Sequence, residues 1–531
     1  MYFGLEEIDV TRKLDPNRLP YVLGVVGLLN ALAGYLRELT LAAIFGVGGT
    51  TDAYFVALGI PMMVGDLLIG GAITAAIIPT LSLVSSDRGH GRDLSRAFVS
   101  IFVMIAVAST LIAGAICAFM PAFINTLAPG STSEIKTLAV QIGRLIIWIL
   151  PVNASLLAVS FALNFKGIFV LPALTPLINH LIFSVLLLIS QGAFVPEALA
   201  VAVLSGPVFM LGIMLLAAFS HGRYSLCLPY FGGLHLRKAW VFSRPVVVSL
   251  GLGSGMGLLI ATHMVVRAFA SHLGVGSISA LSYAFRIYEV PISIITSVAA
   301  TLLLPVCSNL HSQGRRDELA KIIQKGAFWG LAVLAPISFV AFLNAEFLVA
   351  LLFSTGRFDQ GATALTTEAL QGFSAAIIFE SIFIVGFRVL YAMRLSKVAA
   401  FAGLASMISL LTCLNFGPDS LSLLQTALTV SFCFALAAII CVAFVFSRFS
   451  EFLFSSYSKF LRMAGLILFW AFIYGNAFGW LNWAPSSAFA HAVSIVLFLV
   501  LFIMLFALVF RRDTEEAARY TISIFKRVPN D

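Results

Sequence analysis

Charged residues are scarce in this chain of 531 residues: Asp, Glu, Lys and Arg make up only 11% of it, whereas hydrophobic residues make up 60%. The mean hydropathy is +1.03. A soluble protein of this length would need a largely polar surface, so the composition excludes that class. Apolar runs of about 20 residues recur along the whole chain, and each is long enough to cross a bilayer as a helix. The runs are continuous rather than alternating, which argues against a membrane β-barrel.

Metal, redox and nucleotide motifs are also missing. The six cysteines stand singly in or beside apolar segments, as small buried hydrophobes do, and the eight histidines form no HxxxH or HExxH pattern. No GxxxxGK[ST] phosphate-binding loop occurs, so a gradient, the membrane potential or consumption of the substrate must drive any transport. The net charge of +8 is spread over the flanks of apolar runs and forms no basic, aromatic-rich surface. We expect no metal, no cofactor and no nucleic acid.

A sizeable polar domain between the apolar runs is missing as well. A membrane enzyme that builds glycans outside the cell would carry an outward domain with catalytic carboxylates or bases, and the sequence contains no such stretch. This absence favours a protein that is not an enzyme. Residues 1–19 carry mixed charge, and the apolar run after Pro20 is far longer than the apolar part of a signal peptide. We expect this run to be an uncleaved first membrane anchor.

The apolar runs predict about fourteen membrane helices, and the fold class is therefore an all-α polytopic membrane protein. Several helices are longer than a bilayer is thick, so we expect them to tilt or protrude. The predicted helices span residues 20–46, 52–84, 97–128, 137–163, 170–190, 198–220, 241–272, 277–308, 326–353, 363–391, 398–416, 421–447, 463–480 and 488–510.

Lys and Arg are distributed very unevenly over the two sides of this topology. The loops opposite the termini hold only Lys136 and Arg357, five arginines lie within apolar runs, and the other Lys and Arg residues lie on the side of the termini. Positive residues near membrane helices stay on the cytoplasmic side. We therefore expect a cytoplasmic N-terminal segment (1–19) and a cytoplasmic tail (511–531).

Two stretches, six predicted helices apart, repeat the same features. The second predicted helix carries Pro61 and Pro79 and leads into GHGRDLSRAF, while the eighth carries Pro291 and Pro305 and leads into SQGRRDELAKI. Such a repeat is typical of transporters built from two related bundles. It predicts an N-lobe of six helices at 20–220, a cytoplasmic inter-lobe linker at 221–240, a C-lobe of six helices at 241–447, and helices 13 and 14 outside the repeat at 463–510.

Charged residues inside the predicted helices are the first candidates for function. A charge at the bilayer centre costs roughly 2.5–3.5 kcal/mol on insertion scales, so it usually faces protein or a watery cavity. Arg286 and Glu289 are three residues apart on one helical face, which predicts an ion pair. Arg37 is followed directly by Glu38, which must point in another direction. The predicted lining of one cavity, on the first, second, seventh and eighth helices, is Arg37, Asp52, Asp66, Arg267, Arg286 and Glu289.

The cations of this expected cavity are arginines. A guanidinium group binds phosphate oxygens bidentately and stays charged, which favours a phosphate or pyrophosphate ligand. Each arginine could instead form a structural ion pair or extend to a membrane interface, as we expect for Arg144 and Arg388 near helix ends. Glu380 lies in the tenth predicted helix, and the sequence identifies no partner for it.

Four separated stretches carry a family resemblance. They are GYLRELTLAAIFGVGGTTDAYFVALGIP, LNFKGIFVLPALTPLIN, YAFRIYEVPISIITSVAATLLLP and LFSTGRFD. Together they resemble the MurJ/MviN family of lipid II flippases, in the MATE-like MOP superfamily, over most of residues 20–400. The resemblance implies two six-helix lobes around a cationic cavity and a groove at the last two helices for a polyprenyl tail. By position, Arg37, Asp52, Arg286 and Glu289 match charged residues of the family's motifs.

The same resemblance implies the substrate and the membrane. It implies that an undecaprenyl-pyrophosphate-linked glycan precursor moves from the cytoplasmic to the periplasmic leaflet of the bacterial inner membrane. The chain departs from the family's pattern at Ala31 and Gly65, where members that flip lipid II usually have arginines, and at Gly70, where an acidic residue is expected. A less cationic cavity leaves two substrates open, lipid II for peptidoglycan and a lipid-linked exopolysaccharide repeat unit.

Two other functions also stay open at this point. The chain could export small organic cations in exchange for protons or sodium, using Asp52, Asp66 and Glu380. It could instead be a non-transporting membrane scaffold for a glycan-synthesis complex, with dispensable intramembrane charges. The expected partners are a lipid-linked glycan and membrane lipids, with glycan-synthesis proteins as further candidates.

Overall fold

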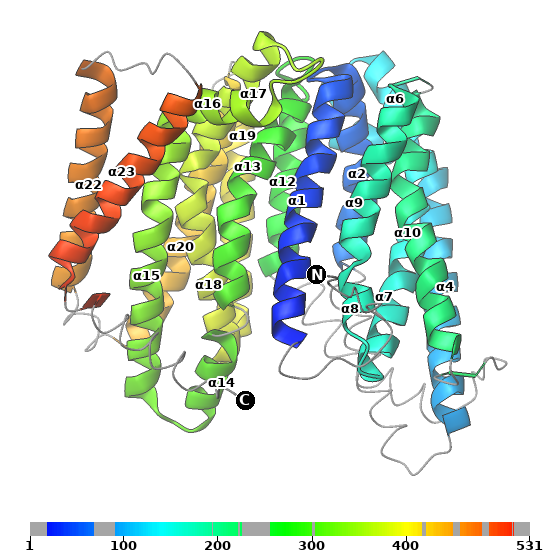
Figure 1. Cartoon of the computed structure of the whole chain (residues 1–531), viewed down its shortest axis with the longest axis horizontal. Coiled ribbons are helices and arrows are strands. Elements are labelled where there is room, and N and C mark those ends of the chain that lie inside the picture. The colour runs from blue at the N-terminus through cyan, green and yellow to red at the C-terminus, as the bar shows by residue number, and fades with distance from the viewer. Residues whose placement is uncertain are drawn as a thin grey trace, which may run out of the picture. The chain divides into compact units, whose positions relative to one another are not determined.

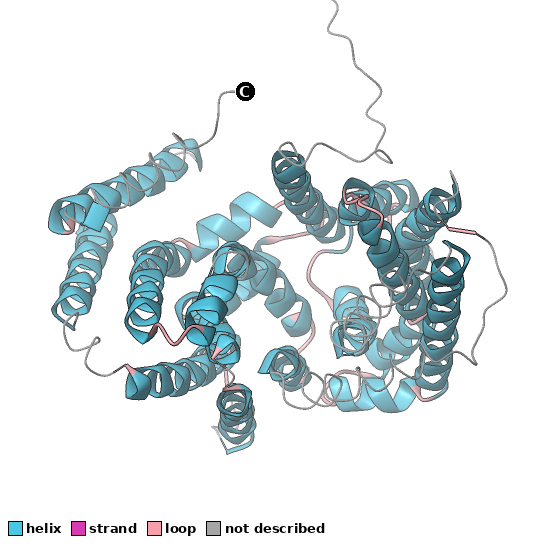
Figure 2. Ribbon diagram, turned by 90° about the horizontal axis from the view of Figure 1, so that it is seen from below, coloured by secondary structure: helices cyan, strands magenta, loops and turns pink. Residues whose placement is uncertain are grey.

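The structure is a computed structural model. It describes residues 19–67, 91–193, 195–220, 224–225, 255–299, 303–393, 395–416, 421–449, 457–480, 488–511 and 513–514. Within these ranges every regular element is a helix and no strand occurs (Figures 1 and 2). The predicted all-α class is confirmed.

All fourteen predicted segments contain helix where the structure describes them. Three are described only in part, because the second is described up to Leu67, the seventh from Gly255 and the eighth without residues 300–302. Among the described residues, ten helices are long and apolar enough to cross a membrane, and up to eleven if a bent pair forms one span. The chain is thus a multi-pass membrane protein, while the count of fourteen spans stays a prediction.

The chain divides into two compact units. Unit 1 comprises Met1–Tyr283, Leu352–Thr366 and Met407–Thr426, and unit 2 comprises Ala284–Leu351, Thr367–Ser406 and Ala427–Asp531. The predicted N-lobe and C-lobe boundaries stay predictions. Most of the predicted linker, from residue 226 onward, lies outside the described residues.

Unit 1 is built mainly from the first half of the chain. Its helices are α1 (Leu19–Phe45), α2 (Gly49–Leu67), α4 (Gly91–Ala118), α5 (Met120–Leu127), α6 (Ser133–Ile146), α7 (Ile149–Phe165), α8 (Val170–Ala173), α9 (Thr175–Ser190), α10 (Val195–Phe219), α12 (Gly255–Ala270) and the first turns of α13 (Ser277–Val298). Long apolar sequences become helices here because a backbone in hydrocarbon must satisfy its own hydrogen bonds. The core between α4, α7 and α10 buries Phe98, Val159 and Met210.

Unit 2 contains the rest of α13 and all or part of each helix after it. These helices are α14 (Leu304–Ser312), α15 (Arg316–Leu343), α16 (Ala345–Phe353), α17 (Gln360–Ser374), α18 (Ala376–Ala392), α19 (Ser396–Phe416), α20 (Leu423–Arg448), α22 (Tyr457–Trp480) and α23 (Ala488–Val509). Residues 352–353 of α16, 360–366 of α17, 407–416 of α19 and 423–426 of α20 belong to unit 1. An aromatic core joins α15, α22 and α23 through Phe328, Trp470 and Phe506. The Trp470 indole N–H donates to the Phe498 carbonyl at 3.0 Å, so its polar atom is satisfied inside this core.

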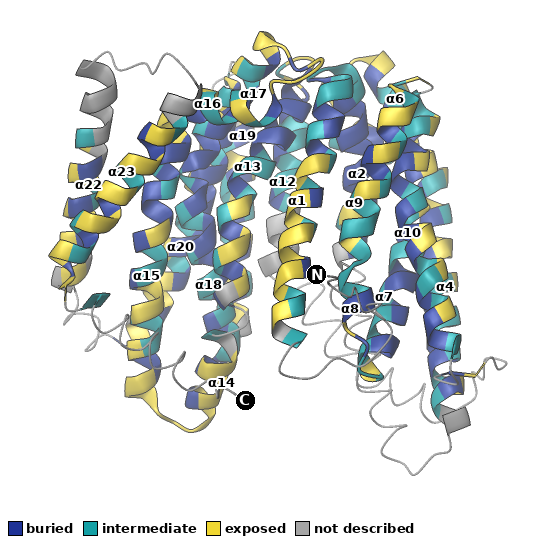
Figure 3. Cartoon of the chain, in the orientation of Figure 1, coloured by how far each residue is buried: buried dark blue, intermediate teal, exposed yellow. Residues whose placement is uncertain are grey.

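Large apolar side chains lie exposed along several helices (Figure 3). On α1 they include Tyr21, Leu28 and Leu32, and on α23 they include Met504 and Leu508, which is 77% exposed. Water would make such continuous apolar faces costly, whereas lipid does not. The surface is that of helices in contact with lipid.

Candidate functional site

Asp52, in the first turn of α2, is bonded to the start of α13 in unit 1. Its Oδ2 accepts the Gly276 N–H at 2.6 Å and its Oδ1 accepts the Ser279 N–H at 2.7 Å. Amide groups at a helix start have no partner within the helix, and they carry the positive end of the helix dipole. Asp52 therefore caps α13 from a different helix, and it does so with only 2% of the residue exposed. We call these two hydrogen bonds the Asp52 clasp.

The end of α1 contacts the loop that follows α16, also within unit 1. The Arg357 N–H donates to the Ala43 carbonyl at 2.8 Å. Two glycines allow this approach, because Gly46 and Gly356 both have positive φ, at 65° and 62°. A Cβ on Gly46 would lie 2.5 Å from the Arg357 carbonyl oxygen, and one on Gly356 would collide with the Ala43 carbonyl. The close approach of the two backbones thus depends on glycine at both positions.

Tyr283 connects the Asp52 clasp with this contact. Its hydroxyl donates to the Gly46 carbonyl at 3.3 Å, and its ring is fully buried. The rings of Phe55, Phe353 and Phe358 surround it, with centroids between 5.2 and 5.6 Å away. One aromatic side chain therefore ties α2, α13 and the 354–359 loop together.

Arg37 is held on α1 by groups from two other helices of unit 1. Its Nη2 donates to the Tyr54 hydroxyl on α2 at 2.7 Å, and its guanidinium carbon lies 4.6 Å from the Phe183 ring centroid on α9. The Glu38 carboxylate is 3.9 Å away, although the two are neighbours in sequence. With 15% of its side chain exposed, Arg37 is an arginine fixed in direction by a hydroxyl and an aromatic face.

Two further predicted site residues lie on the adjoining helices of unit 1. Arg267, in the last turn of α12, is half-buried, and its Nη1 lies 3.7 Å from the position that a Cβ on Gly59 of α2 would take. Asp66 lies near the described end of α2, and its side chain falls outside the described part of the structure.

Arg286 and Glu289 belong to unit 2 and form the predicted ion pair. The Arg286 Nη1 lies 3.0 Å from the Glu289 Oε2, with 30% and 43% of their side chains exposed. The predicted pairing is confirmed. An exposed pair of this kind is worth little in stability, about 0–1 kcal/mol, so an anion could replace the Glu289 carboxylate at modest cost.

The other charged residues of the predicted membrane helices, Arg144, Arg388 and Glu380, differ in burial and in hydrogen-bond partners. Arg144 is exposed near the end of α6. Arg388 on α18 donates from Nη1 to the Thr296 carbonyl, near the end of α13. Glu380, also on α18, is buried and hydrogen-bonded to Tyr288 on α13.

Sequence reasoning missed four aromatic residues: Tyr54, Phe183 and Tyr288 contact charged side chains, and Tyr283 donates to the Gly46 carbonyl. Two of them are placed close to Arg286 in the stretch YAFRIYE. Tyrosine hydroxyls inside an apolar helix are a signal that could have identified them, since a buried hydroxyl needs a partner. Phe183 gave no such signal.

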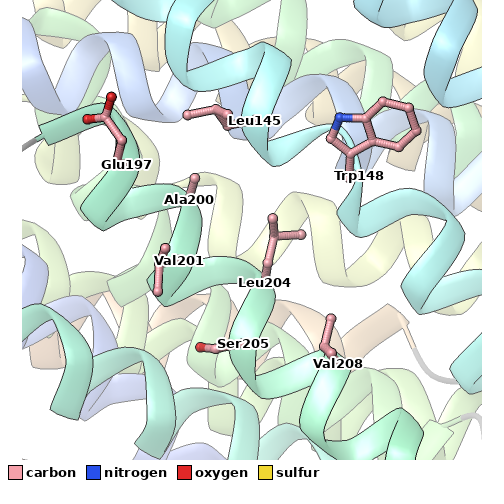
Figure 4. A pocket seen from close by; sticks show the side chains of 8 residues that line it. All are labelled: Leu145, Trp148, Glu197, Ala200, Val201, Leu204, Ser205 and Val208. Atoms are coloured by element: carbon pink, nitrogen blue, oxygen red, sulfur yellow. The ribbon is translucent and has the colours of Figure 1, made fainter.

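A groove of about 450 Å³ lies between α6 and α10 in unit 1 (Figure 4). It is lined by Leu145, Trp148, Glu197, Ala200, Val201, Leu204, Ser205 and Val208. This lining is almost entirely apolar and contains no cation, so it does not suit an anionic head group. The arginine-bearing helices fit that role better.

The family model described as lipid II flippase MurJ matches residues 41–494. The chain belongs to the lipid II flippase MurJ family. The match includes α2, α12 and α13, which carry five of the six predicted site residues, while Arg37 lies just before it. A family of flippases confirms the expectation that the chain is a transporter and not an enzyme.

Curated relatives of this MurJ family match about two thirds of the chain. The lipid II flippase MurJ of Burkholderia cenocepacia is 27% identical over 369 residues, covering 66% of this chain and 68% of the relative. A probable lipid II flippase MurJ of Buchnera aphidicola is 27% identical over 366 residues, covering 67% and 69%. That of Vibrio cholerae is 25% identical over 397 residues, covering 70% and 71%.

Solved structures agree with the fold of this member of the MurJ family. A lipid II flippase MurJ in an inward closed conformation aligns with a TM-score of 0.74 at 18% identity, covering 93% of this chain and 99% of that one. An inward-facing MATE family transporter of the MOP superfamily aligns with a TM-score of 0.63 at 12% identity, covering 82% and 99%. At these identities the likeness concerns the fold, and it confirms the expected MATE-like architecture.

Proposed function

We propose that this chain is a flippase for lipid II or a closely similar undecaprenyl-pyrophosphate-linked glycan precursor. It moves the precursor from the cytoplasmic to the periplasmic leaflet of the bacterial inner membrane, for peptidoglycan synthesis. The observation that carries this proposal is the MurJ family match over residues 41–494. Both termini lie in the cytoplasm, as the Lys and Arg distribution predicts. Glycan-synthesis proteins on either side of the membrane are the partners that supply and consume the substrate.

Arg286 is the first residue that we assign to the pyrophosphate. Its side chain is partly exposed and its present partner, Glu289, is weakly held. A pyrophosphate offers more charge and more acceptor oxygens than one carboxylate, so it competes for the guanidinium group. Glu289 then balances Arg286 whenever no substrate is bound.

Arg37 has the complementary property of being fixed in direction. The Tyr54 hydroxyl and the Phe183 ring fix the direction of its guanidinium group, and Glu38 forms a longer ion pair with it at 3.9 Å. A cation that is oriented in advance binds an anion without a further loss of side-chain entropy. We therefore assign Arg37 to substrate binding as well, and we propose that Arg267 and Asp66, which belong to the same unit, adjust the charge near it.

The Asp52 clasp is assigned to close the pathway on the side opposite the termini. Alternating access needs contacts that hold one side shut and can part as a set. The clasp, the Tyr283 hydroxyl and the contact at Gly356 are few, short and confined to helix ends, which suits this task. Both oxygens of Asp52 already accept amide N–H groups, so the carboxylate is poorly placed to bind an exported cation. This disfavours the cation-exporter alternative.

Complementation in living bacteria tests the proposed function. The chain is expressed in a strain whose own lipid II flippase can be depleted, and lipid II on the outer leaflet is measured with a membrane-impermeant probe. We expect growth and outer-leaflet lipid II to be restored by the wild-type chain and lost with R286A at equal membrane abundance. Restored growth with R286A would remove Arg286 from the mechanism. The wild-type chain could instead fail to restore growth here but restore exopolysaccharide export in a strain depleted of its exopolysaccharide flippase. That result would identify the substrate as a lipid-linked exopolysaccharide repeat unit.

A further inference from the structure

Glu380 is a buried carboxyl group that the proposed mechanism does not use. It lies on α18 within unit 2 and is 4% exposed. Its side chain is hydrogen-bonded to Tyr288 of α13, and its Oε2 has no hydrogen-bond partner among the described residues. The charge that acts on it is that of Glu289, which has the same sign. Nothing in its described surroundings neutralises a negative charge on this group.

The chemistry of this environment favours the protonated acid. A buried carboxylate without a cation or a full set of donors is strongly disfavoured, and it takes up a proton instead. The neutral acid can donate its O–H to the Tyr288 oxygen, which leaves Oε2 as an ordinary carbonyl acceptor. An unpaired carbonyl oxygen costs much less than an unpaired charge.

The other titratable groups on neighbouring helices do not change this balance. On α13, Arg286 is paired with Glu289. On α18 itself, Arg388 is bonded to the Thr296 carbonyl, and Tyr391 lies at the far end. Helix α14 carries Cys307 and His311, and helix α20 carries Cys433 and Cys441. The first turns of α15 carry Arg316, Asp317, Glu318, Lys321 and Lys325. Among the described residues none of these forms an ion pair with Glu380.

Glu380 lies just beyond a bend in its membrane segment. The axes of α17 and α18 differ by 46° at Ala375. The Ser338 hydroxyl donates to the Ser374 carbonyl at 2.7 Å and the Ser431 hydroxyl donates to the Gly372 carbonyl at 2.8 Å, so carbonyls at the end of α17 have side-chain donors. The bend is therefore held by side-chain hydroxyls from α15 and α20.

Tyr288 contacts both sides of this bend. Its ring stacks on Phe373 of α17, with centroids 4.9 Å apart and planes at 30°, while its hydroxyl reaches Glu380 on α18. A cavity of about 190 Å³ borders Tyr288, with Pro291, Ile337 and Ile377 in its lining. The hydrogen bond between Glu380 and Tyr288 is thus placed where it can fix or release the bend.

We propose that Glu380 is a proton-binding site of the transport cycle, with Tyr288 linking its protonation to the bend between α17 and α18. This inference rests on the proposed flippase function. The proton comes from water when Glu380 is neutralised and returns to water when the bend opens, so only an O–H bond forms and breaks. An anionic head group that takes Arg286 from Glu289 exposes Glu380 to a stronger negative charge and favours proton uptake. Substrate binding and proton binding then support each other.

Infrared difference spectroscopy on the purified full-length chain in lipid vesicles tests the site without any transport. The C=O stretch of a protonated carboxylic acid is recorded while the pH is stepped. We expect a band in the wild-type chain that is lost in E380Q, shifted in Y288F and retained in E368Q, whose glutamate is exposed on α17. An unchanged band in E380Q would overturn the proposal.

A transport measurement on the same vesicles separates the proton site from the flippase function. A fluorescent lipid-linked pyrophosphate is the probe, with either a proton or a sodium gradient imposed. We expect a proton gradient to change the wild-type and E368Q rates several-fold and to leave the E380Q rate unchanged. Acceleration by sodium alone, or an unaltered proton response in E380Q, would overturn the proposal. Absence of wild-type transport would overturn the flippase function instead, while the infrared band would still decide whether Glu380 binds the proton.

Discussion

Asp52 of α2 caps the first turn of α13 through the amide of Ser279, 227 residues further along the chain, at 2.7 Å. A second amide, that of Gly276, binds the other carboxylate oxygen at 2.6 Å. The two helices are therefore joined by a buried carboxylate in addition to the ring contact between Phe55 and Tyr283. Contacts of this kind can be tested one atom at a time.

Replacing Asp52 with Asn removes one acceptor and places an amide N–H₂ against a backbone N–H. We expect D52N to lower the free energy of unfolding by about 1–3 kcal/mol, because a buried donor is left without an acceptor. Thermal unfolding of the detergent-solubilised chain measures this. D359N is the matched control, since the exposed Asp359 caps α17 through the Ala362 N–H and its loss should cost far less. Equal stability of D52N and the wild-type chain would remove the clasp from the mechanism.

The contact between α1 and the 354–359 loop predicts a strong effect of two small substitutions. G46A and G356A each place a methyl group against a backbone carbonyl and also force an unfavourable positive φ, which costs about 1 kcal/mol or more before the collision. We expect both variants to weaken this contact and raise the labelling of a cysteine introduced at Ala43. G27A on the same helix α1 meets no atom within 4 Å and serves as the control. Labelling of G46A and G356A at the G27A level would contradict the assignment.

The surroundings of Arg37 predict that a positive charge at this position is not sufficient for transport. R37K keeps the positive charge but loses the planar group that stacks on Phe183 and reaches Tyr54, so transport should fall strongly while folding is retained. Y54F removes a single hydrogen bond, so its effect should be about 1 kcal/mol. Y35F removes the hydrogen bond from the Tyr35 hydroxyl on α1 to the Leu352 carbonyl on α16, and this variant should transport normally. Wild-type transport by R37K would show that Arg37 acts only as a distributed charge.

Local spacing predicted some of these features well. Continuous apolar runs were enough to place helix in all fourteen segments, because hydrocarbon leaves the backbone no other way to satisfy its hydrogen bonds. The ion pair of Arg286 and Glu289 followed from a separation of three residues on one helix.

Contacts between residues far apart in the chain could not be predicted from local spacing. Asp52 bonds to an amide 224 residues away, and Arg37 faces Phe183 on another helix. No period or spacing in one sequence encodes such pairs, because helix packing alone brings them together. The same holds for Glu380, whose partner Tyr288 lies on α13. The sequence identified the charged residues but not the aromatic groups that fix their directions.

The most direct test of the central claim is flipping of lipid II by the purified chain in vesicles. Lipid II with a fluorescent head group is placed in both leaflets, and a membrane-impermeant reagent quenches the outer leaflet. We predict that the wild-type chain exposes the inner-leaflet pool to quenching and that R286A slows this exposure at least about tenfold, equivalent to roughly 1.4 kcal/mol. An inner-leaflet pool that stays protected with the wild-type chain, or flipping by R286A at the wild-type rate, would contradict the proposed mechanism.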